Sequence, residues 1–115
     1  MKDYKFELEY EDKKYQLIFN LNVMQEIQEE YGTIEKWGAL TDGKSGETNV
    51  KALIFGLTHM INEAIEIKND EKGTNDPLMT NKQVGRLITK IGVEKSTQKL
   101  NEAIVEGTKG EEKNE

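Results

Sequence analysis

Near the start of the chain, apolar and polar residues alternate with a period of two, as they do in a half-buried strand. The alternation covers Tyr4–Tyr10 and resumes over Lys14–Phe19, and only Glu11-Asp12-Lys13 separates the two runs. The apolar positions are Tyr4, Phe6, Leu8, Tyr10, Tyr15, Leu17 and Phe19. So short a connection predicts an antiparallel hairpin, whose apolar face the following chain must cover, because a lone hairpin is marginal in water.

The rest of the chain follows the helical period, with apolar residues three or four positions apart. Five helices are predicted, and the third is expected to be central because its apolar residues, from Val50 to Ile65, converge on one side. The predicted helices cover about 20–31, 33–40, 49–68, 80–91 and 94–106.

Capping residues mark the predicted helix starts. Asn20 and Asn22 are alternative N-caps of the first helix, Thr33 can cap the second, and Thr80 with Gln83 has the pattern of a capping box. Each supplies a side-chain oxygen for backbone N–H groups that the first helical turn leaves without a partner.

Glycines mark two predicted helix ends. Gly32 is the expected left-handed residue after the first helix, and Gly92 with Val93 has the pattern of a Schellman motif, in which Val93 returns to the preceding helix. The segments 41–48 and 69–77 contain glycines and other turn-forming residues, and the second holds the only proline. We expect both segments to be exposed loops, the second of them mobile.

These elements predict a single α+β domain, in which an N-terminal two-stranded antiparallel β-hairpin packs on a bundle of four to five helices. A chain of 115 residues suits one core, because two smaller units would each bury too little surface. The domain is expected to span residues 1–107. Residues 108–115 have no apolar anchor and are predicted to form a disordered acidic tail.

Composition narrows the classes of partner. The formal net charge is −6, and no cluster of Lys and Arg interleaved with aromatic residues is present, so nucleic acid is not an expected partner. The absence of cysteine excludes disulfides and thiolate metal sites and suits a reducing compartment. No stretch approaches the roughly 20 apolar residues of a membrane span, and Met1 is not followed by a signal-peptide pattern. We therefore expect a soluble, cytoplasmic protein with no membrane partner.

Catalytic chemistry has few candidates in this sequence. His59, Glu63 and Glu66 have helical spacing that can place them around a metal ion, but a solvated polar face is the favoured interpretation. Glu26, Glu29 and Glu30 lie opposite an apolar stripe and indicate an acidic outer face rather than an acid–base pair. No glycine-rich loop has a phosphate-binding context. The chain is therefore expected not to be an enzyme and to need no metal or cofactor.

Three residues are candidates for a protein-binding surface. Phe55 lies on the back of the third helix, away from its apolar stripe, and His59 follows one turn later. An exposed Phe there would mark a contact surface, whereas the alternative is that the hairpin or the last helix covers it. Trp37 either fills the core beside Ile34 and Leu40 or serves as a binding hot spot, and core filling is favoured.

The order of elements and three motifs resemble the tail assembly chaperones of long-tailed, siphovirus-type bacteriophages and prophages of Gram-positive bacteria. The motifs are "QEEYGTIEKW" at 28–37, "MINEA" at 60–64 and the spacing T-x-x-Q-V-G-x-L-I at 80–88. The resemblance extends over nearly the whole chain, to about residue 107.

The resemblance implies non-catalytic assembly work in viral morphogenesis. Members of this family bind the tape measure protein, keep it soluble while the tail tube polymerises around it, and are absent from the mature virion. It implies the host cytoplasm as location, the tape measure protein and the major tail tube protein as partners, and often a C-terminally extended frameshift product. Independently of the resemblance, Phe55 and His59, if exposed, are candidates for a self-association surface. The alternative is a small acidic adaptor or regulatory module unrelated to tails.

Overall fold

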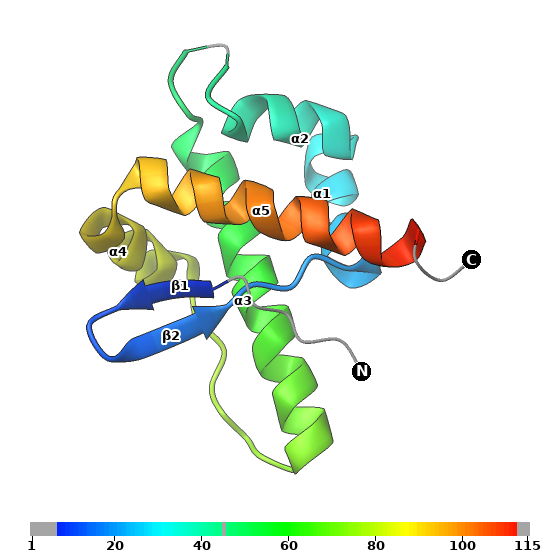
Figure 1. Cartoon of the computed structure of the whole chain (residues 1–115), viewed down its shortest axis with the longest axis vertical. Coiled ribbons are helices and arrows are strands. Elements are labelled where there is room, and N and C mark those ends of the chain that lie inside the picture. Colours follow the sequence, from blue (N-terminus) through cyan, green and yellow to red (C-terminus); the bar gives the residue numbers. More distant parts are fainter. Residues whose placement is uncertain (1–6, 45, 113–115) are drawn as a thin grey trace.

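The N-terminal strands form a hairpin that leads into a group of helices (Figure 1). The computed structural model describes the chain over residues 7–44 and 46–112, with side chains described as far as residue 108. The strands are β1 (Glu7–Tyr10) and β2 (Lys13–Gln16), which pair antiparallel. The predicted hairpin is confirmed over this range.

The hairpin turn is tighter than the three residues that separate the alternating runs. Tyr10 pairs with Lys13, so the turn consists of Glu11 and Asp12, and Glu11 adopts a positive φ of 56°. Leu8 is buried opposite Tyr15, as the alternation predicts. The predicted inward positions 4 and 6 lie outside the described residues.

The second strand ends at Gln16, three residues before the predicted end. Leu17, Ile18 and Phe19 are all buried, so the alternation of inward and outward side chains stops there. This segment runs across the third helix, where the Ile18 N–H donates to the Met60 carbonyl oxygen at 3.3 Å. Because the segment is covered on both sides, no position along it needs to be polar.

Five helices follow the hairpin, as predicted, and together with it they form a compact α+β globule. They are α1 (Leu21–Tyr31), α2 (Ile34–Thr41), α3 (Val50–Lys72), α4 (Asn81–Ile91) and α5 (Val93–Glu112). The third helix contacts the other four helices and β2, which confirms its central position. Figure 1 shows α5 crossing α3, with α4 on one side of α3 and α1 and α2 on the other.

The start of α1 resolves the choice between two asparagines. The Asn20 side chain accepts a hydrogen bond from the Val23 N–H at 3.2 Å, so Asn20 is the N-cap. Asn22 instead donates to the Glu63 carboxylate of α3 at 3.0 Å, and Asn20 donates to the same oxygen at 2.8 Å. The two asparagines therefore fasten the first turn of α1 to α3.

The predicted N-caps of two other helices are confirmed. Thr33 caps α2 by accepting from Lys36, and Thr80 and Gln83 make the reciprocal capping box of α4. Gly32 ends α1 as predicted and has a positive φ of 93°, but its ψ of −53° shows that the predicted left-handed helical conformation is wrong.

Two helices are longer than predicted. The third helix continues from the expected end near Lys68 to Lys72, because Gly73 is the first residue there to take the left-handed conformation, with φ 68° and ψ 28°. The last helix runs to Glu112 instead of Glu106, so it includes part of the predicted tail 108–115. Positions 113–115 of that predicted tail lie outside the described residues.

The predicted Schellman motif at Gly92 is wrong. Gly92 has φ 110° and ψ 140°, and its N–H donates to the Ile88 carbonyl at 2.7 Å while its carbonyl accepts from Ser96 at 3.0 Å. Gly92 thus forms a hydrogen bond at the end of α4 through its N–H and one at the start of α5 through its carbonyl. Val93 is the first residue of α5 and stays 42% exposed, because the immediate new helix turns it outward.

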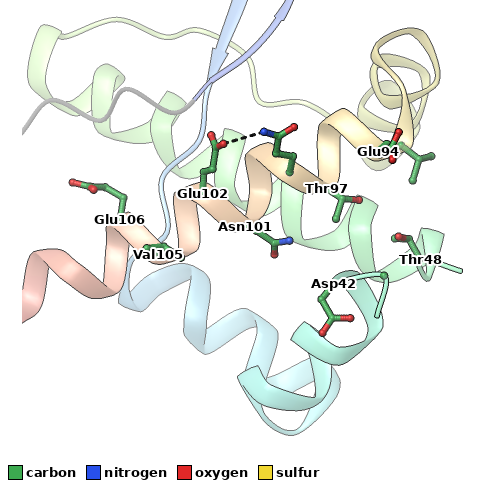
Figure 2. A pocket seen from close by; sticks show the side chains of 11 residues that line it. Asp42, Thr48, Glu94, Thr97, Asn101, Glu102, Val105 and Glu106 are labelled. Carbon is green, nitrogen blue, oxygen red and sulfur yellow. Dashed lines mark hydrogen bonds between the residues drawn. The ribbon is translucent and has the colours of Figure 1, made fainter. Parts of the chain in front are cut away.

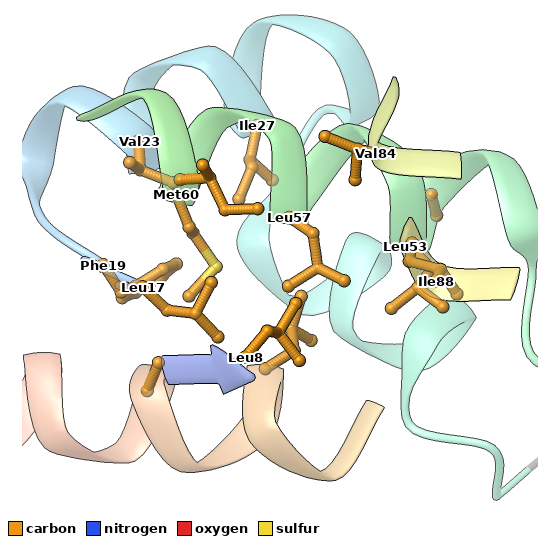
Figure 3. Close-up of a cluster of buried hydrophobic side chains, with 14 of the residues drawn as sticks. Leu8, Leu17, Phe19, Val23, Ile27, Leu53, Leu57, Met60, Val84 and Ile88 are labelled. Carbon is orange, nitrogen blue, oxygen red and sulfur yellow. The ribbon is translucent and has the colours of Figure 1, made fainter. Parts of the chain in front are cut away.

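The core lies where the hairpin, α1 and α4 meet α3 (Figure 3). Leu57 and Met60 of α3 are fully enclosed, and apolar side chains from the neighbouring elements surround them. The labelled contributors are Leu8, Leu17 and Phe19 from the N-terminal segment, Val23 and Ile27 from α1, and Val84 and Ile88 from α4.

The segment between α3 and α4 is fastened to α3 rather than free. The Asn62 amide donates to the Met79 carbonyl at 2.9 Å and accepts from the Met79 N–H at 2.8 Å. Asn69 accepts from the Thr74 hydroxyl at 2.7 Å and from the Asp76 N–H at 3.0 Å. These side-chain hydrogen bonds hold the segment at both ends. The sequence pattern that predicts a mobile loop does not indicate them.

Candidate protein-binding groove

Trp37 lies inside the core. Its side chain is 0% exposed, its indole N–H donates to the Ala52 carbonyl at 3.0 Å, and its ring stacks on Phe19 with 6.5 Å between centroids. Gly56 of α3 lies against the ring so closely that a Cβ there would overlap the Trp37 Cζ2 atom. The core-filling interpretation of Trp37 is confirmed, and a partner cannot reach this ring in the folded conformation.

Phe55 is half-buried, and the element that covers it is α1. The Tyr31 ring meets Phe55 edge to face with 5.5 Å between centroids, and the centroid of the His59 ring lies 4.5 Å from that of Phe55. The alternatives considered from sequence placed the hairpin or the last helix over Phe55, and neither makes this ring contact. Phe55 keeps part of its surface exposed, but its contact with Tyr31 of α1 leaves less of it free than on an uncovered helix face.

Tyr31 is half-buried within this aromatic group. Its hydroxyl is enclosed and has no hydrogen-bond partner among the described residues. Burial raises the pKa of Tyr31 above the ordinary value of 10.0, and the neighbouring Glu30 carboxylate adds to the rise. The neutral phenol is therefore favoured in the fold.

The residues of α3 whose spacing could suit a metal ion make other contacts in the structure. Glu63 accepts hydrogen bonds from Asn20 and Asn22, which makes it a fastening point for α1. His59 lies beside Phe55 instead. Within the described part of the chain, no three His, Asp or Glu side chains are grouped so that they could hold a metal ion.

A large open groove runs along α5 and faces the segment that joins α2 to α3 (Figure 2). Its volume is about 900 Å³. One wall is α5, and the other includes Asp42, Gly43 and Thr48. The segment with Thr48 is held in place because the Asn49 N–H donates to the Leu40 carbonyl at 2.8 Å.

Two parallel rows of side chains on α5 line this groove. Residues four apart lie one above another on a helix, so each row forms a ridge along the surface. The first row is Val93, Thr97, Asn101 and Val105. The second row is Glu94, Gln98, Glu102 and Glu106. The first row offers an exposed valine at each end and polar side chains in the middle, and the second row is mainly acidic.

The charged side chains among the described lining residues of the groove are all acidic. Its lining contains Asp42, Glu94, Glu102 and Glu106, and the described lining residues include no lysine, arginine or histidine. Glu102 lies 3.7 Å from the Lys99 ammonium and accepts from Gln98 at 3.3 Å. Glu94 and Glu106 have no ion-pair or hydrogen-bond partner among the side chains that the structure describes. Both carboxylates remain available to a cationic group.

A second, smaller groove of about 480 Å³ separates the hairpin turn from α4. Arg86 and Lys90 line it, and the Lys90 ammonium lies 5.5 Å from the centroid of the Tyr10 ring. Glu11 and Asp12 also line it, so its charges are mixed. The groove along α5 is larger and has one sign of charge, which makes it the better candidate for a binding site.

The groove along α5 is not among the sites predicted from the sequence. The predicted stripe of the last helix, which included Thr97 and Leu100, identifies the face that packs on the core. Val105 lies off this stripe and is 55% exposed. An apolar residue off the apolar stripe, like Phe55 on its own helix, is the feature of the sequence that could have indicated this groove.

Comparison with protein-family models, curated proteins and solved structures gave no match to this chain. None of the described helices combines the length and apolar character that crossing a membrane requires.

Proposed function

We propose that this protein is a tail assembly chaperone of a long-tailed bacteriophage or prophage and that it binds the tape measure protein without catalysis. The motifs from Gln28 to Trp37 and from Thr80 to Ile88 supply the family resemblance. The structural observation that supports a binding role is the open groove along α5, with Val93 and Val105 exposed between carboxylates. Such a surface suits an amphipathic helix, which buries apolar residues and keeps charged residues at the rim.

The acidic surface and the open groove of this domain suit the task of keeping a tape measure protein in solution. A tape measure protein is long and largely helical, so its apolar stretches aggregate when they are exposed before the tube encloses them. A small domain with a net charge of −6 that covers such a stretch would add repulsion between neighbouring complexes and keep them in solution. The major tail tube protein is the proposed second partner, and the host cytoplasm is the proposed location.

A protein-binding adaptor unrelated to tails is the second candidate, because the same groove would serve another helical partner. The order of genes separates the two proposals. A gene for a major tail protein upstream and a very long open reading frame downstream would support the chaperone proposal. A gene neighbourhood with neither feature would favour the adaptor.

The direct test is co-expression with a fragment of the tape measure protein encoded nearby, followed by measurement of its soluble fraction. The wild-type chain should raise the soluble yield of the fragment and co-purify with it. Val105→Asp should reduce both effects, whereas Val50→Asp should not. Val50 is a matched control, since both valines are 55% exposed and only Val105 lines the groove.

Phe55 is a weaker probe than Val105. A charge at Phe55 would break its contact with Tyr31 and disturb the packing of α1 on α3. Lost activity of such a variant would then report unfolding as readily as lost binding. If the wild-type protein neither co-purifies with the fragment nor changes its solubility, the chaperone proposal is wrong.

A further inference from the structure

We propose that the groove along α5 receives a helical segment of the partner that carries small residues on its contact face and lysine or arginine beside them. The identity of the partner as the tape measure protein rests on the function proposed above. The chemistry of the segment follows from the shape, charge and unpaired polar group of the groove. Four observations on α5 and the facing segment carry the argument.

The shape of the groove favours a helix as its occupant. The row from Val93 to Val105 contains side chains four residues apart, and helices pack by fitting such a ridge into the groove of another helix. The row covers 12 intervals (105 − 93), or about 18 Å at 1.5 Å per residue. A partner helix of about three turns would match this length.

The middle of the groove favours small side chains on the occupant. Thr97 is buried and Asn101 is half-buried, whereas the valines at both ends of the row are exposed. Figure 2 shows Thr97 and Asn101 on the part of α5 that faces Asp42 and Thr48. A ridge of alanine, serine or glycine would let the partner approach the floor, while larger apolar side chains would meet the two valines.

The charge of the groove determines which side chains flank that ridge. Four carboxylates line the groove without a cation among the described lining residues, and Glu94 and Glu106 at its two ends have no partner among the described side chains. A lysine or arginine near each end of the occupant would be attracted to them. A segment with carboxylates at these places would be repelled, so the groove discriminates by charge as well as by shape.

Thr97 supplies an observation independent of the carboxylates. Its side chain is only 9% exposed, and its hydroxyl finds no hydrogen-bond partner among the described residues. Buried hydroxyl groups are ordinarily hydrogen-bonded. The hydroxyl oxygen is enclosed in the free protein, so it reaches a serine hydroxyl or a backbone carbonyl of the occupant only when rotation about χ1 turns it toward the groove that Thr97 lines.

The test uses the full-length protein and two designed peptides of about 18 residues, which is long enough to cover the groove. Both peptides are labelled with fluorescein and carry alanine at every fourth position. One has lysine in the flanking row, and the other has glutamate at the same places. Binding is measured by fluorescence anisotropy at about 50 mM and about 300 mM NaCl.

We expect the lysine peptide to bind, more weakly at the higher salt concentration, and the glutamate peptide to bind at least about tenfold more weakly. The double variant Glu94→Gln with Glu106→Gln should weaken binding of the lysine peptide about five- to tenfold, since two rim charges are removed. Thr97→Val should weaken it about threefold, through one lost hydrogen bond.

The matched control is the double variant Glu26→Gln with Glu29→Gln, which removes the same charge from α1, outside the groove. Its affinity for the lysine peptide should stay within about twofold of the wild type. Amide chemical-shift changes on binding should be largest at the two α5 rows. Equal binding of both peptides, no binding, an equal loss in the α1 control, or shifts centred on α4 would each overturn the inference.

Co-expression separates a failure of this inference from a failure of the proposed function. If the Glu94→Gln with Glu106→Gln variant solubilises the tape measure fragment as well as the wild type does, the charged groove is not the site and the inference is wrong. The chaperone function would then stand. If the wild-type protein fails to bind the fragment but the peptide results hold, the groove has the proposed specificity and the assigned partner is wrong.

Discussion

The backbone of Gly56 lies directly against the indole ring of Trp37. The ring also stacks on Phe19, and Phe19 lies close to the backbone of Gly107. Each of the two glycines thus allows a close approach to one of the two aromatic residues, and four separate parts of the chain meet here. The only tryptophan joins α2 to α3 and, through Phe19, to α5, whose outer face lines the groove.

Gly56→Ala should destabilise the fold. The new methyl group would overlap a ring that is 0% exposed and hydrogen-bonded to Ala52, so the ring cannot move aside without further loss. We expect the free energy of unfolding to fall by about 1–3 kcal/mol, measured by urea denaturation. Gly38→Ala is the control, because a Cβ there meets no atom within 4 Å and alanine favours the helix by about 0.5–1 kcal/mol. Equal effects of the two substitutions would contradict the packing described here.

Gly107→Ala should loosen the C-terminal part of α5. Its Cβ would overlap the Phe19 carbonyl oxygen, which is backbone and cannot rotate away. We expect faster amide hydrogen exchange in α5 and a loss of about 1–3 kcal/mol in the free energy of unfolding. Gly85→Ala in α4 is the control, since its Cβ would meet Ile54 at an ordinary 3.4 Å. Unchanged exchange in α5 would show that the helix does not depend on this close approach.

Asn62→Ala should release the segment before α4. It removes both hydrogen bonds to Met79 and leaves the Met79 N–H and carbonyl partly buried without those partners. We expect a loss of about 1–3 kcal/mol and faster amide exchange at residues 78–80. Asn75→Ala changes an exposed residue of the same segment and should alter neither quantity. If both variants behave alike, the Asn62 side chain does not fix the segment.

Stability at alkaline pH should depend on Tyr31. Its pKa is raised in the fold, chiefly by burial and then by Glu30, so the unfolded chain loses this phenolic proton at a lower pH. The contribution of Tyr31 is fully present below the unfolded pKa of about 10 and is lost as pH rises through the folded value. Tyr31→Phe should abolish this loss.

Urea denaturation from about pH 7 to about pH 11 tests the Tyr31 prediction. The difference in unfolding free energy between the wild type and Tyr31→Phe should be constant at neutral pH. Above about pH 10 the wild type should lose more stability than the variant. Parallel profiles over the whole range would contradict the raised pKa.

Local patterns in the sequence predicted most of the elements. The alternation around Leu8, the capping oxygens of Thr33 and Thr80, and the stripe of α3 act within a few residues, so neighbouring positions were enough to identify the hairpin and five helices. The placement of Trp37 in the core also followed from its local spacing. Helix ends were less certain, because residues 69–72 and 107–112 are compatible with both helix and loop.

The candidate site depended on contacts between distant parts of the chain. The sequence leaves open whether Phe55 is exposed or covered, and contact with Tyr31 of α1 settles this. It favours a solvated face for Glu63, whereas Asn20 and Asn22 bond to this carboxylate. The groove exists only because α5 lies opposite the α2–α3 segment. Local backbone preferences and apolar periodicity along the chain were thus enough to predict the helices and the hairpin. Which polar and apolar side chains remain available to a partner emerged from the packed fold, because burial depends on which elements pack together.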